Sequence, residues 1–385
     1  MMRLMFRVVI AMVAAGPVLA EGPPAVRVVR APGGGIQPQA AVDASGVIHI
    51  VTFRGDPGAG DLDYAAWKPG EPGFGPAIRV NSEPSSALVT GTVRGAQVAI
   101  GAGGRVHVAW YGSSKATPAN PVGGVPFLYT RSDPARGGFE PQRNLMTRTG
   151  SLDGGGSIAA DGNGRVYAAW HGQARGSVGE QDRRMWIARS ADDGATFAPE
   201  EPAWDRPTGA CACCGTKALA DPGGSVYLLY RAATGGVDRG MILLTSKDRG
   251  LHFDGTTLDP WRINACPMST ASLAGSGPGV LAAWETRGQV RFARVDPGEA
   301  GITPSAPPGV EGTRKHPSIA VNHRGETVLA WTEGTGWQKG GSLAWQAFDR
   351  EGRPIGEAGR VDRGIPTWGL AAVVARPDGS FVIVH

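Results

Sequence analysis

The chain has 385 residues, including 60 glycines and 30 prolines, and a formal net charge of +4. The 11 tryptophans and the regular apolar runs exclude a disordered chain, although the glycine and proline content alone would fit one. Lysine and arginine are spread along the sequence without a basic block, which excludes nucleic acid and anionic lipid as partners.

The first twenty residues predict a secretory signal peptide. Arg3 and Arg7 flank an apolar stretch over residues 8–15, small residues follow, and cleavage is expected after Ala20. This apolar run is too short to span a membrane, and no later segment is long and apolar enough to do so. No cysteine directly follows the cleavage point, so we expect no lipoprotein anchor. The mature protein is expected to be soluble, monomeric, and periplasmic or secreted.

An internal repeat runs along the rest of the chain as a series of seven hairpins. Each unit is an apolar alternation, a tight glycine turn and a second alternation, as in AAVDASGVIHIVTF from residue 40 and IAADGNGRVYAAW from residue 158. Alternation with period two in Val, Ile and Ala predicts strands, and glycine supplies the positive φ that tight turns need. The turn glycines are Gly46, Gly104, Gly164, Gly224, Gly279, Gly325 and Gly379. The second strands of the first six hairpins end in an aromatic residue: Phe53, Trp110, Trp170, Tyr230, Trp284 and Trp331.

A second signature follows several of the hairpins. SADDGATF (residues 190–197) and SKDRGLHF (residues 246–253) share the pattern S-x-D-x-G-x-x-F, and SDPARGGF (132–139) and WKPGEPGF (67–74) are degenerate copies. We expect Asp192 and Asp248 to accept hydrogen bonds from the backbone of their own turns. These segments resemble the Asp-box of sialidase-type β-propellers.

Four short strands per unit of about 45–60 residues, repeated radially, predict an all-β fold, a β-propeller of four-stranded antiparallel blades. We count seven blades, and six is the alternative because Asp-box propellers are often six-bladed. The last hairpin lacks a third strand, which AVRVVR (residues 25–30) would supply to close the ring. The expected organisation is a signal peptide over 1–20, an N-terminal segment over 21–35 and a sialidase-like propeller over 36–385.

One face of the propeller is expected to carry function. The loops before the innermost strands and after the second strands share this face, whereas the turns of Asp192 and Asp248 lie on the opposite face. The residues that follow the second strands are Arg54, Tyr111, His171, Arg231, Glu285 and Glu333. Those before the innermost strands include Arg94, Cys211, Cys213, Cys214, Cys266, His316 and Trp368. His49, His107, Tyr167 and Tyr227 recur three residues after a turn glycine, which predicts packing between blades.

The four cysteines are expected to gather at one side of the channel mouth. Cys211, Cys213 and Cys214 precede the innermost strand of the fourth blade, and Cys266 precedes that of the fifth. Three chemistries remain open. An even number of cysteines in an oxidising compartment favours disulfides, with Cys266 bonded to a member of the cluster. Convergent thiolates alternatively suit Cu(I) or Zn(II), with Met268 and His316 as further ligands. A thiol–disulfide redox role is the third, and no C-x-x-C pair supports it.

The hairpins and Asp-boxes resemble the sialidase-like BNR-repeat superfamily, and the C-x-C-C sequence resembles a group of exported bacterial sialidase-like proteins. The resemblance implies an arginine triad for a substrate carboxylate, a Tyr–Glu nucleophile pair and an Asp acid. The F/Y-R-I-P segment that usually supplies the first arginine is missing. Weak candidates from the blade register are Arg54, Arg94 and Arg231, with Tyr111 and Glu285 or Glu333.

The function predicted from these observations is therefore a ligand-binding or protein-interaction module for a carbohydrate or protein. Its expected binding residues are His171, Arg231, Glu285, His316 and Trp368. The first alternative is an exo-α-sialidase-type glycoside hydrolase, and the second is a periplasmic protein that binds copper or zinc.

Overall fold

The computed structural model describes residues 22–385 apart from positions 151, 175, 278, 297–301 and 310. The predicted signal peptide lies outside the described residues. The described part of the chain forms 28 strands and three short 3-10 helices, η1 (Pro32–Gly34), η2 (Ala102–Gly104) and η3 (Glu180–Asp182), with no α-helix. Consequently, no helix among these residues has the length and apolar character needed to cross a membrane.

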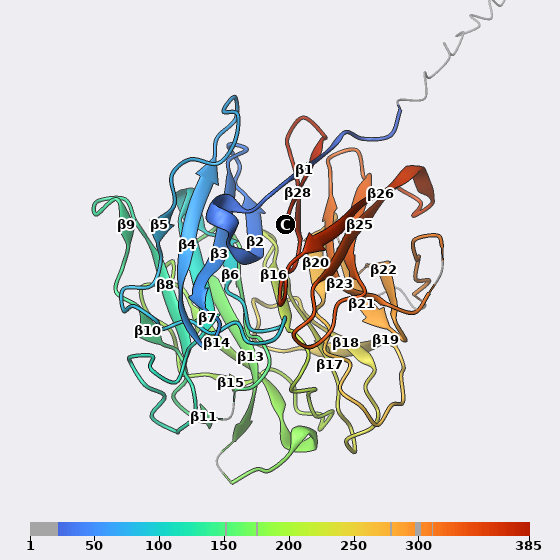
Figure 1. Ribbon diagram of the computed structural model, residues 1–385. Helices are drawn as coiled ribbons and strands as arrows, with labels where there is room; N and C mark the ends of the chain where they lie inside the picture. Colours follow the sequence, from blue (N-terminus) through green and yellow to red (C-terminus); the bar gives the residue numbers. More distant parts are fainter. Residues whose placement is uncertain (1–21, 151, 175, 278, 297–301, 310) are drawn as a thin grey trace, which may run out of the picture.

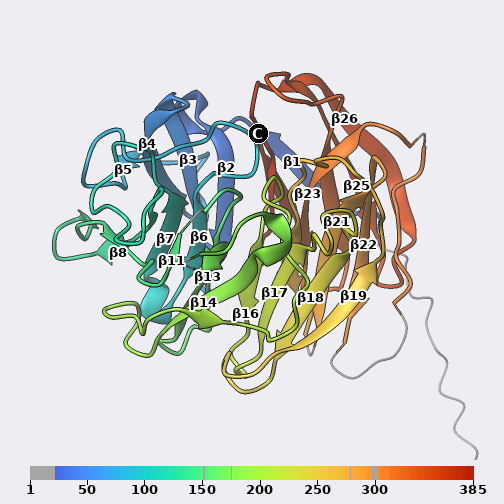
Figure 2. The same cartoon turned by 90° about the horizontal axis from the view of Figure 1, so that it is seen from below.

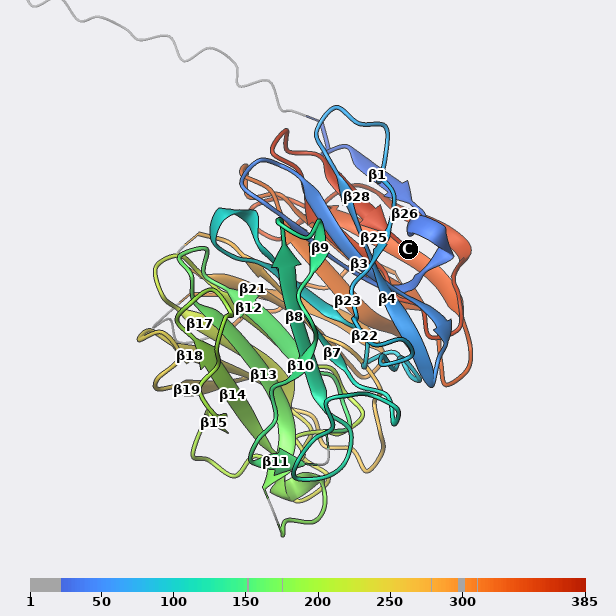
Figure 3. The ribbon, with the colours of Figure 1, turned by 90° about the vertical axis from the view of Figure 1, so that its left-hand side faces the viewer.

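The strands form seven sheets arranged around a central axis, and each sheet is a blade (Figure 1). Blade 1 holds β2 (Ile36–Val42), β3 (Ile48–Asp56), β4 (Ala59–Trp67) and β5 (Ile78–Arg79). Blade 2 holds β6 (Gln97–Ile100), β7 (Val106–Tyr111), β8 (Phe127–Asp133), β9 (Gly138–Phe139) and β10 (Arg143–Asn144). Blade 3 holds β11 (Thr149–Gly150), β12 (Ser157–Ala160), β13 (Val166–Ala174), β14 (Arg184–Ser190) and β15 (Glu201–Pro202). In Figure 3 the neighbouring strands β3, β8 and β13 of these three blades face the viewer in sequence.

The second half of the ring repeats the same plan. Blade 4 holds β16 (Lys217–Ala220), β17 (Val226–Arg231), β18 (Met241–Ser246) and β19 (Asp254–Asp259). Blade 5 holds β20 (Ser272–Gly275), β21 (Val280–Thr286) and β22 (Gln289–Val295). Blade 6 holds β23 (Arg314–Val321), β24 (Thr327–Glu333), β25 (Gly341–Phe348) and β26 (Pro354–Ile365).

Blade 7 closes the ring with strands from both ends of the chain. It pairs β27 (Ala372–Ala375) with β28 (Phe381–Val384), and β28 pairs in parallel with β1 (Val26–Val29). The colours run once around the axis in Figures 1 and 2, from blue to red, until β28 meets β1. The predicted seven blades and the ring-closing N-terminal strand are therefore confirmed.

The hydrophobic core lies between the blades. Seven clusters of buried side chains each draw residues from two adjacent blades, including the pair formed by blades 7 and 1. The tryptophans that end the second strands, such as Trp170 and Trp284, are fully buried in these clusters. Tyr167 and Tyr227 belong to the clusters between blades 3 and 4 and between blades 4 and 5, as predicted. Because apolar burial drives folding, each blade depends on its neighbours for its core.

The S-x-D-x-G-x-x-F turns have the predicted hydrogen bonds. Asp192 Oδ1 accepts from the Thr196 backbone N–H at 2.8 Å, and Asp248 Oδ1 accepts from that of His252 at 2.9 Å. The Asp193 N–H donates to the carbonyl of Gly164, which lies in the turn between β12 and β13. This turn therefore lies at the end of blade 3 where its innermost strand finishes. The cysteine loop lies at the end of blade 4 where the innermost strand begins, so the two features are on opposite faces of the propeller.

Candidate functional site

The cysteine loop, residues 209–216, leads directly into β16, the innermost strand of blade 4. The Cys211 N–H donates to the Arg231 carbonyl at 2.9 Å, and the Gly215 N–H donates to the Ser269 carbonyl at 3.0 Å. The loop begins at Gly209 with φ +61°, where a Cβ would lie 2.7 Å from the Ala233 carbonyl oxygen. Only glycine fits this approach without a shift of the backbone. The two hydrogen bonds to Arg231 and Ser269 fix the loop against blade 4 and against the loop that precedes blade 5.

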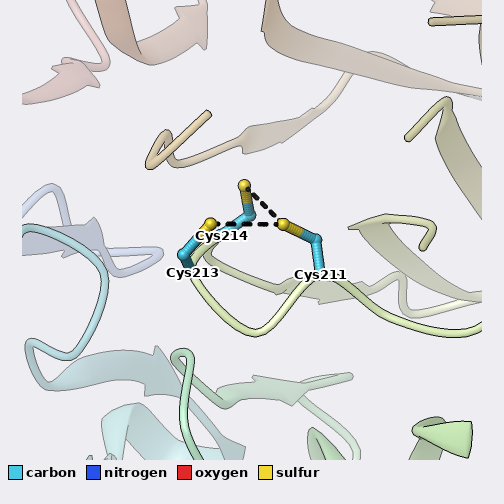
Figure 4. Close-up of side chains that lie close together, drawn as sticks. All are labelled: Cys211, Cys213 and Cys214. Carbon is cyan, nitrogen blue, oxygen red and sulfur yellow. Dashed lines mark hydrogen bonds between the residues drawn. The ribbon is translucent and has the colours of Figure 1, made fainter. Parts of the chain in front are cut away.

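The three clustered thiols point toward one another (Figure 4). Cys211 Sγ lies 3.4 Å from the sulfurs of both Cys213 and Cys214, and all three sulfurs lie within 4.8 Å of one another. Cys211 and Cys214 are buried, whereas Cys213 is partly exposed. A disulfide has a sulfur–sulfur distance of about 2.0 Å, so these contacts are between free thiols. The group is a compact sulfur donor set with one member accessible from outside.

The surroundings favour ionisation of one thiol over the others. Burial opposes the charged form of Cys214, but hydrogen bonds with Cys211 and Cys213 and the charge of Arg231 outweigh it and lower its pKa. The same sulfur contacts, followed by burial, raise the pKa of Cys213. Of the three thiols, Cys214 is therefore the one whose surroundings favour the thiolate.

A buried arginine, Arg239, lies beside the thiols and contacts one of them. Arg239 donates from one terminal nitrogen to Cys211 Sγ at 3.0 Å and from the other to Glu180 Oε2 at 2.7 Å. Glu180 Oε1 in turn accepts from the backbone N–H of Ala212, inside the cysteine loop. This chain of contacts holds the positive charge of Arg239 against Cys211 Sγ, where it stabilises negative charge on that sulfur.

Arg231 and Glu285 were predicted to shape a binding surface, and the structure encloses both side chains. They are buried, at 3% and 1% exposure. Arg231 donates to the carbonyls of Arg239 and Glu285, and its terminal nitrogen lies 3.7 Å from the Glu285 carboxylate. Arg231 Nε and Glu285 Oε2 are buried without a hydrogen-bond partner among the described residues, so this pair lies in the interior of the protein.

His171, another predicted binding residue, is also buried, with 1% exposure. A Cβ on Gly154 would lie 2.2 Å from His171 Nε2 and 2.6 Å from the Cys214 carbonyl oxygen. The glycine therefore lets the ring approach the back of the cysteine loop. Burial lowers the pKa of His171 to about 4, so the ring is neutral at neutral pH and supports the loop without adding charge.

The prediction that all four cysteines converge holds for three of them only. Cys266 is exposed and stays outside the sulfur group. No two of the four thiols are bonded, so the structure gives no support to the predicted bridge between Cys266 and the cluster. The physical reason is that Cys266 lies in the loop after β19 with its side chain exposed to solvent. The next residue, Pro267, is held by a hydrogen bond of 2.6 Å from Lys315 Nζ to its carbonyl oxygen.

His316 is engaged by protein groups and does not join the sulfur group. Its Nδ1 accepts from the Thr270 N–H at 3.3 Å, which leaves Nε2 to donate to the Thr92 hydroxyl at 3.2 Å. Burial lowers the pKa of His316 to about 3, so the ring is neutral. Met268, the other predicted auxiliary ligand, lines the same pocket as Cys213 and His316.

We call this pocket the mouth pocket. It is lined by Gly91, Thr92, Val93, Arg94, Cys213, Met268, Lys315, His316, Gly336, Trp337 and Trp368. Trp337 and Trp368 meet edge to face at 6.3 Å, and Trp337 is 53% exposed. Met268, His316 and Trp368 all have positive φ, between 47° and 57°, just before or at the start of an innermost strand. His316 and Trp368, two of the predicted binding residues, both line this pocket, and Cys213 is the clustered cysteine that reaches it.

The weak candidates for catalysis are each held by a different partner. Arg54 is paired with Asp63 at 2.7 Å on the outer part of blade 1, and Arg94 is paired with Asp153 at 2.6 Å. Tyr111 donates to the Leu152 carbonyl, and burial raises its pKa to about 12. Glu333 is paired with Arg314 and Arg360. Neither a Tyr–Glu contact nor a shared arginine cluster is recorded among these side chains.

Sequence reasoning missed Glu180, Arg239 and Trp337. The first two lie outside the hairpin repeat, in η3 and in the loop before β18, so no recurring position marks them. The signal available for Trp337 is that it is a large aromatic residue in a glycine-rich segment, EGTGWQKGG, where a core residue is not expected.

Comparisons with known proteins agree with this architecture. No protein-family model and no curated protein matches the chain. Among solved structures, a protein of unknown function from Dyadobacter fermentans matches with a TM-score of 0.52 and 15% identity, over 88% of this chain and 98% of that one. A leech intramolecular trans-sialidase solved with 2,7-anhydro-Neu5Ac matches with a TM-score of 0.51 and 7% identity, over 87% and 79%. An α-L-arabinofuranosidase from Fusarium graminearum, solved with an iminosugar inhibitor, matches with a TM-score of 0.52 and 8% identity, over 85% and 93%.

These likenesses define the fold class as a sialidase-like β-propeller. The identities are low, so they concern the fold alone and carry no activity with them. On this fold the chain carries a C-x-C-C loop with three converging thiols.

Proposed function

We propose that this chain is an exported, non-catalytic binding protein whose ligand is a soft metal ion, Cu(I). The observation that carries the proposal is the approach of three cysteine sulfurs to within 4.8 Å of one another. Sulfur ligands select Cu(I), Zn(II) and iron–sulfur clusters over hard ions such as magnesium or calcium. The predicted signal peptide supports export.

The choice of Cu(I) over Zn(II) depends on the number of donors. Structural zinc sites are almost always four-coordinate and closed, with ligands in C-x-x-C or similar pairs. Here three sulfurs converge within one loop, and among the described residues no fourth His, Cys, Asp or Glu joins the group. A three-sulfur set suits Cu(I), which accepts low coordination numbers, and the Arg239 contact to Cys211 offsets part of the negative charge.

The engaged arginines and carboxylates argue against the hydrolase alternative. A sialidase requires free arginines for the substrate carboxylate and an acid and nucleophile that face the same sugar. Arg94 is satisfied by Asp153, and Arg231 is buried among backbone carbonyls. The side chains that would do this chemistry are already used to hold the protein together.

Metal binding is tested by loading the protein with Cu(I) under reducing conditions and competing with a chromogenic Cu(I) chelator. We expect one ion per chain, and sulfur scattering in X-ray absorption. Cys213→Ser should weaken binding strongly, and the matched control Cys266→Ser should leave it unchanged because Cys266 stands outside the sulfur group. Failure to retain copper, or equal loss in both variants, would reject the proposal. Preferential retention of zinc would change the metal and keep the site.

A second candidate function is carbohydrate binding in the mouth pocket. It is favoured by the exposed Trp337 ring, its contact with Trp368 and the flanking cations Arg94 and Lys315. Aromatic faces with adjacent polar groups suit a sugar ring. Titration with sialyl- and arabino-oligosaccharides, compared between the native protein and Trp337→Ala, tests this candidate. A measurable affinity that is lost in the variant supports it, and absence of binding rejects it.

A further inference from the structure

The central channel contains a lysine, Lys217, that no carboxylate neutralises among the residues that the structure describes. Lys217 is the first residue of β16, and its Nζ reaches across the channel to Gln39 Oε1 at 2.9 Å and Gln97 Oε1 at 2.7 Å. These glutamines lie on the innermost strands of blades 1 and 2, opposite blade 4. An ammonium group has three hydrogens, and two of them are used here, so the third is available to a ligand.

The cavity around Lys217 has no acidic lining. Its interior volume is about 110 Å³, and it is lined by side chains of the innermost strands and their preceding loops. Among the described residues that line it, the titratable side chains are Lys217 and His316, and His316 is neutral for the reason given above. The exposure of Lys217 is intermediate because the channel is hollow, although protein surrounds it. Burial lowers its pKa to about 8, as expected for a cation without a counter-charge.

Hydroxyl groups from three successive blades face the same cavity. Ser272 Oγ accepts from the Ile319 N–H at 3.2 Å, and Ser318 Oγ accepts from the Val373 N–H at 3.0 Å. Because each oxygen already accepts a backbone hydrogen bond, its own O–H is free to donate into the channel. Thr216 is only 4% exposed, and its buried hydroxyl has no partner among the described residues. A buried polar group without a partner usually marks a missing ligand or water.

We propose that this cavity is a binding site for a small monovalent anion, held by the Lys217 ammonium and by the hydroxyls of Thr216, Ser272 and Ser318. The donors come from blades 4, 5 and 6, and the two glutamines hold the lysine in place from blades 1 and 2. The ligand class is a halide or a carboxylate of the size of acetate, since both accept hydrogen bonds from an ammonium and from hydroxyls. The bound anion supplies the charge that the channel lacks and links five of the seven blades.

The test measures the melting temperature at constant ionic strength while chloride or acetate replaces gluconate, which is too large to reproduce the small-anion contacts. We expect the melting temperature of the native protein to rise with the small anion, because a ligand that binds only the folded state stabilises it. Lys217→Met should raise the half-saturating concentration at least about tenfold. The matched control Lys115→Met removes an exposed lysine outside the cavity and should behave like the native protein.

A second variant covers the outcome in which Lys217→Met does not fold. Thr216→Val replaces only the hydroxyl that has no partner, so it should fold and weaken the anion response several-fold. Crystals grown with bromide should show an anomalous peak next to Lys217 Nζ. A response to chloride alone identifies an inorganic anion, and a response to acetate as well identifies a carboxylate ligand. The proposal is overturned if both anions act like gluconate, or if the response persists in Lys217→Met and Thr216→Val.

Discussion

Replacement of Arg239 by leucine should weaken Cu(I) binding without unfolding the propeller. Arg239 is 5% exposed, and its guanidinium lies 3.0 Å from Cys211 Sγ and 2.7 Å from Glu180 Oε2. A hydrogen bond to a charged group contributes about 1.5–3 kcal/mol, and each 1.4 kcal/mol corresponds to about a tenfold change in affinity. The expected loss is therefore roughly 10–100-fold, the range typical of residues that orient metal ligands. Leucine keeps much of the buried volume and offers no sulfur to Cu(I), so the effect of the charge is separated from those of a large cavity and of a new ligand.

The assay is a competition titration against a Cu(I) chelator, with the melting temperature recorded in parallel. Arg262→Leu is the matched control, because Arg262 is 74% exposed at its side chain and pairs with Asp238 in the same region. The control should change the affinity less than about twofold, since exposed ion pairs contribute little. If Arg239→Leu stays folded and binds Cu(I) as tightly as the native protein, the inferred role of Arg239 is refuted.

Three further predictions concern the opposite face and the missing chemistry. Asp192→Ala and Asp248→Ala should each lower stability by roughly 1 kcal/mol through lost turn hydrogen bonds, with Cu(I) affinity unchanged; lost affinity at an unchanged melting temperature would show that the faces are reversed. Hydrogen bonds from Thr196, acting against slight burial, lower the pKa of Asp192 to about 2. Its contribution to folding stability is therefore complete above the pKa of the unfolded chain, about 3.9, and is lost as the pH falls toward 2. The difference in melting temperature between the native protein and Asp192→Asn should therefore shrink below about pH 4, and a constant difference down to about pH 2 would contradict this assignment. No appreciable release of a chromogenic leaving group from sialic-acid substrates is expected between about pH 4 and 8, and turnover abolished by Arg231→Ala in folded protein would restore the hydrolase.

The blade plan was predictable because it depends on local signals that recur. A glycine with positive φ, such as Gly164 or Gly325, marks each hairpin, and a buried aromatic at the end of the second strand marks the first six. The register of these hairpins also placed the C-x-C-C loop before the innermost strand of blade 4. It could not place Cys266, because the repeat specifies where a strand begins but not how far the preceding loop extends from the channel. Arg239 and Glu180 meet the thiols through contacts between separate loops, which no spacing in the sequence encodes.

The hairpin register predicted that Met268, His316 and Trp368 lie at the channel mouth, but it could not predict their backbone conformation. Met268, His316 and Trp368 adopt φ values of 47°, 53° and 57°, although sequence rules assign such values to glycine and asparagine. Each such residue costs on the order of 1–3 kcal/mol and persists only when its surroundings require it. The left-handed residues Asp193 and Arg249 on the opposite face lie in tight turns, where a chain reversal explains them. At the mouth the same conformation recurs at Gln37 in blade 1, with φ 50°, and in β2 and β23 it coincides with a bulge in the pairing of the innermost strand. The bulge is therefore part of the blade plan, and in blades 5, 6 and 7 the residues that carry this conformation, Met268, His316 and Trp368, line one pocket beside Cys213.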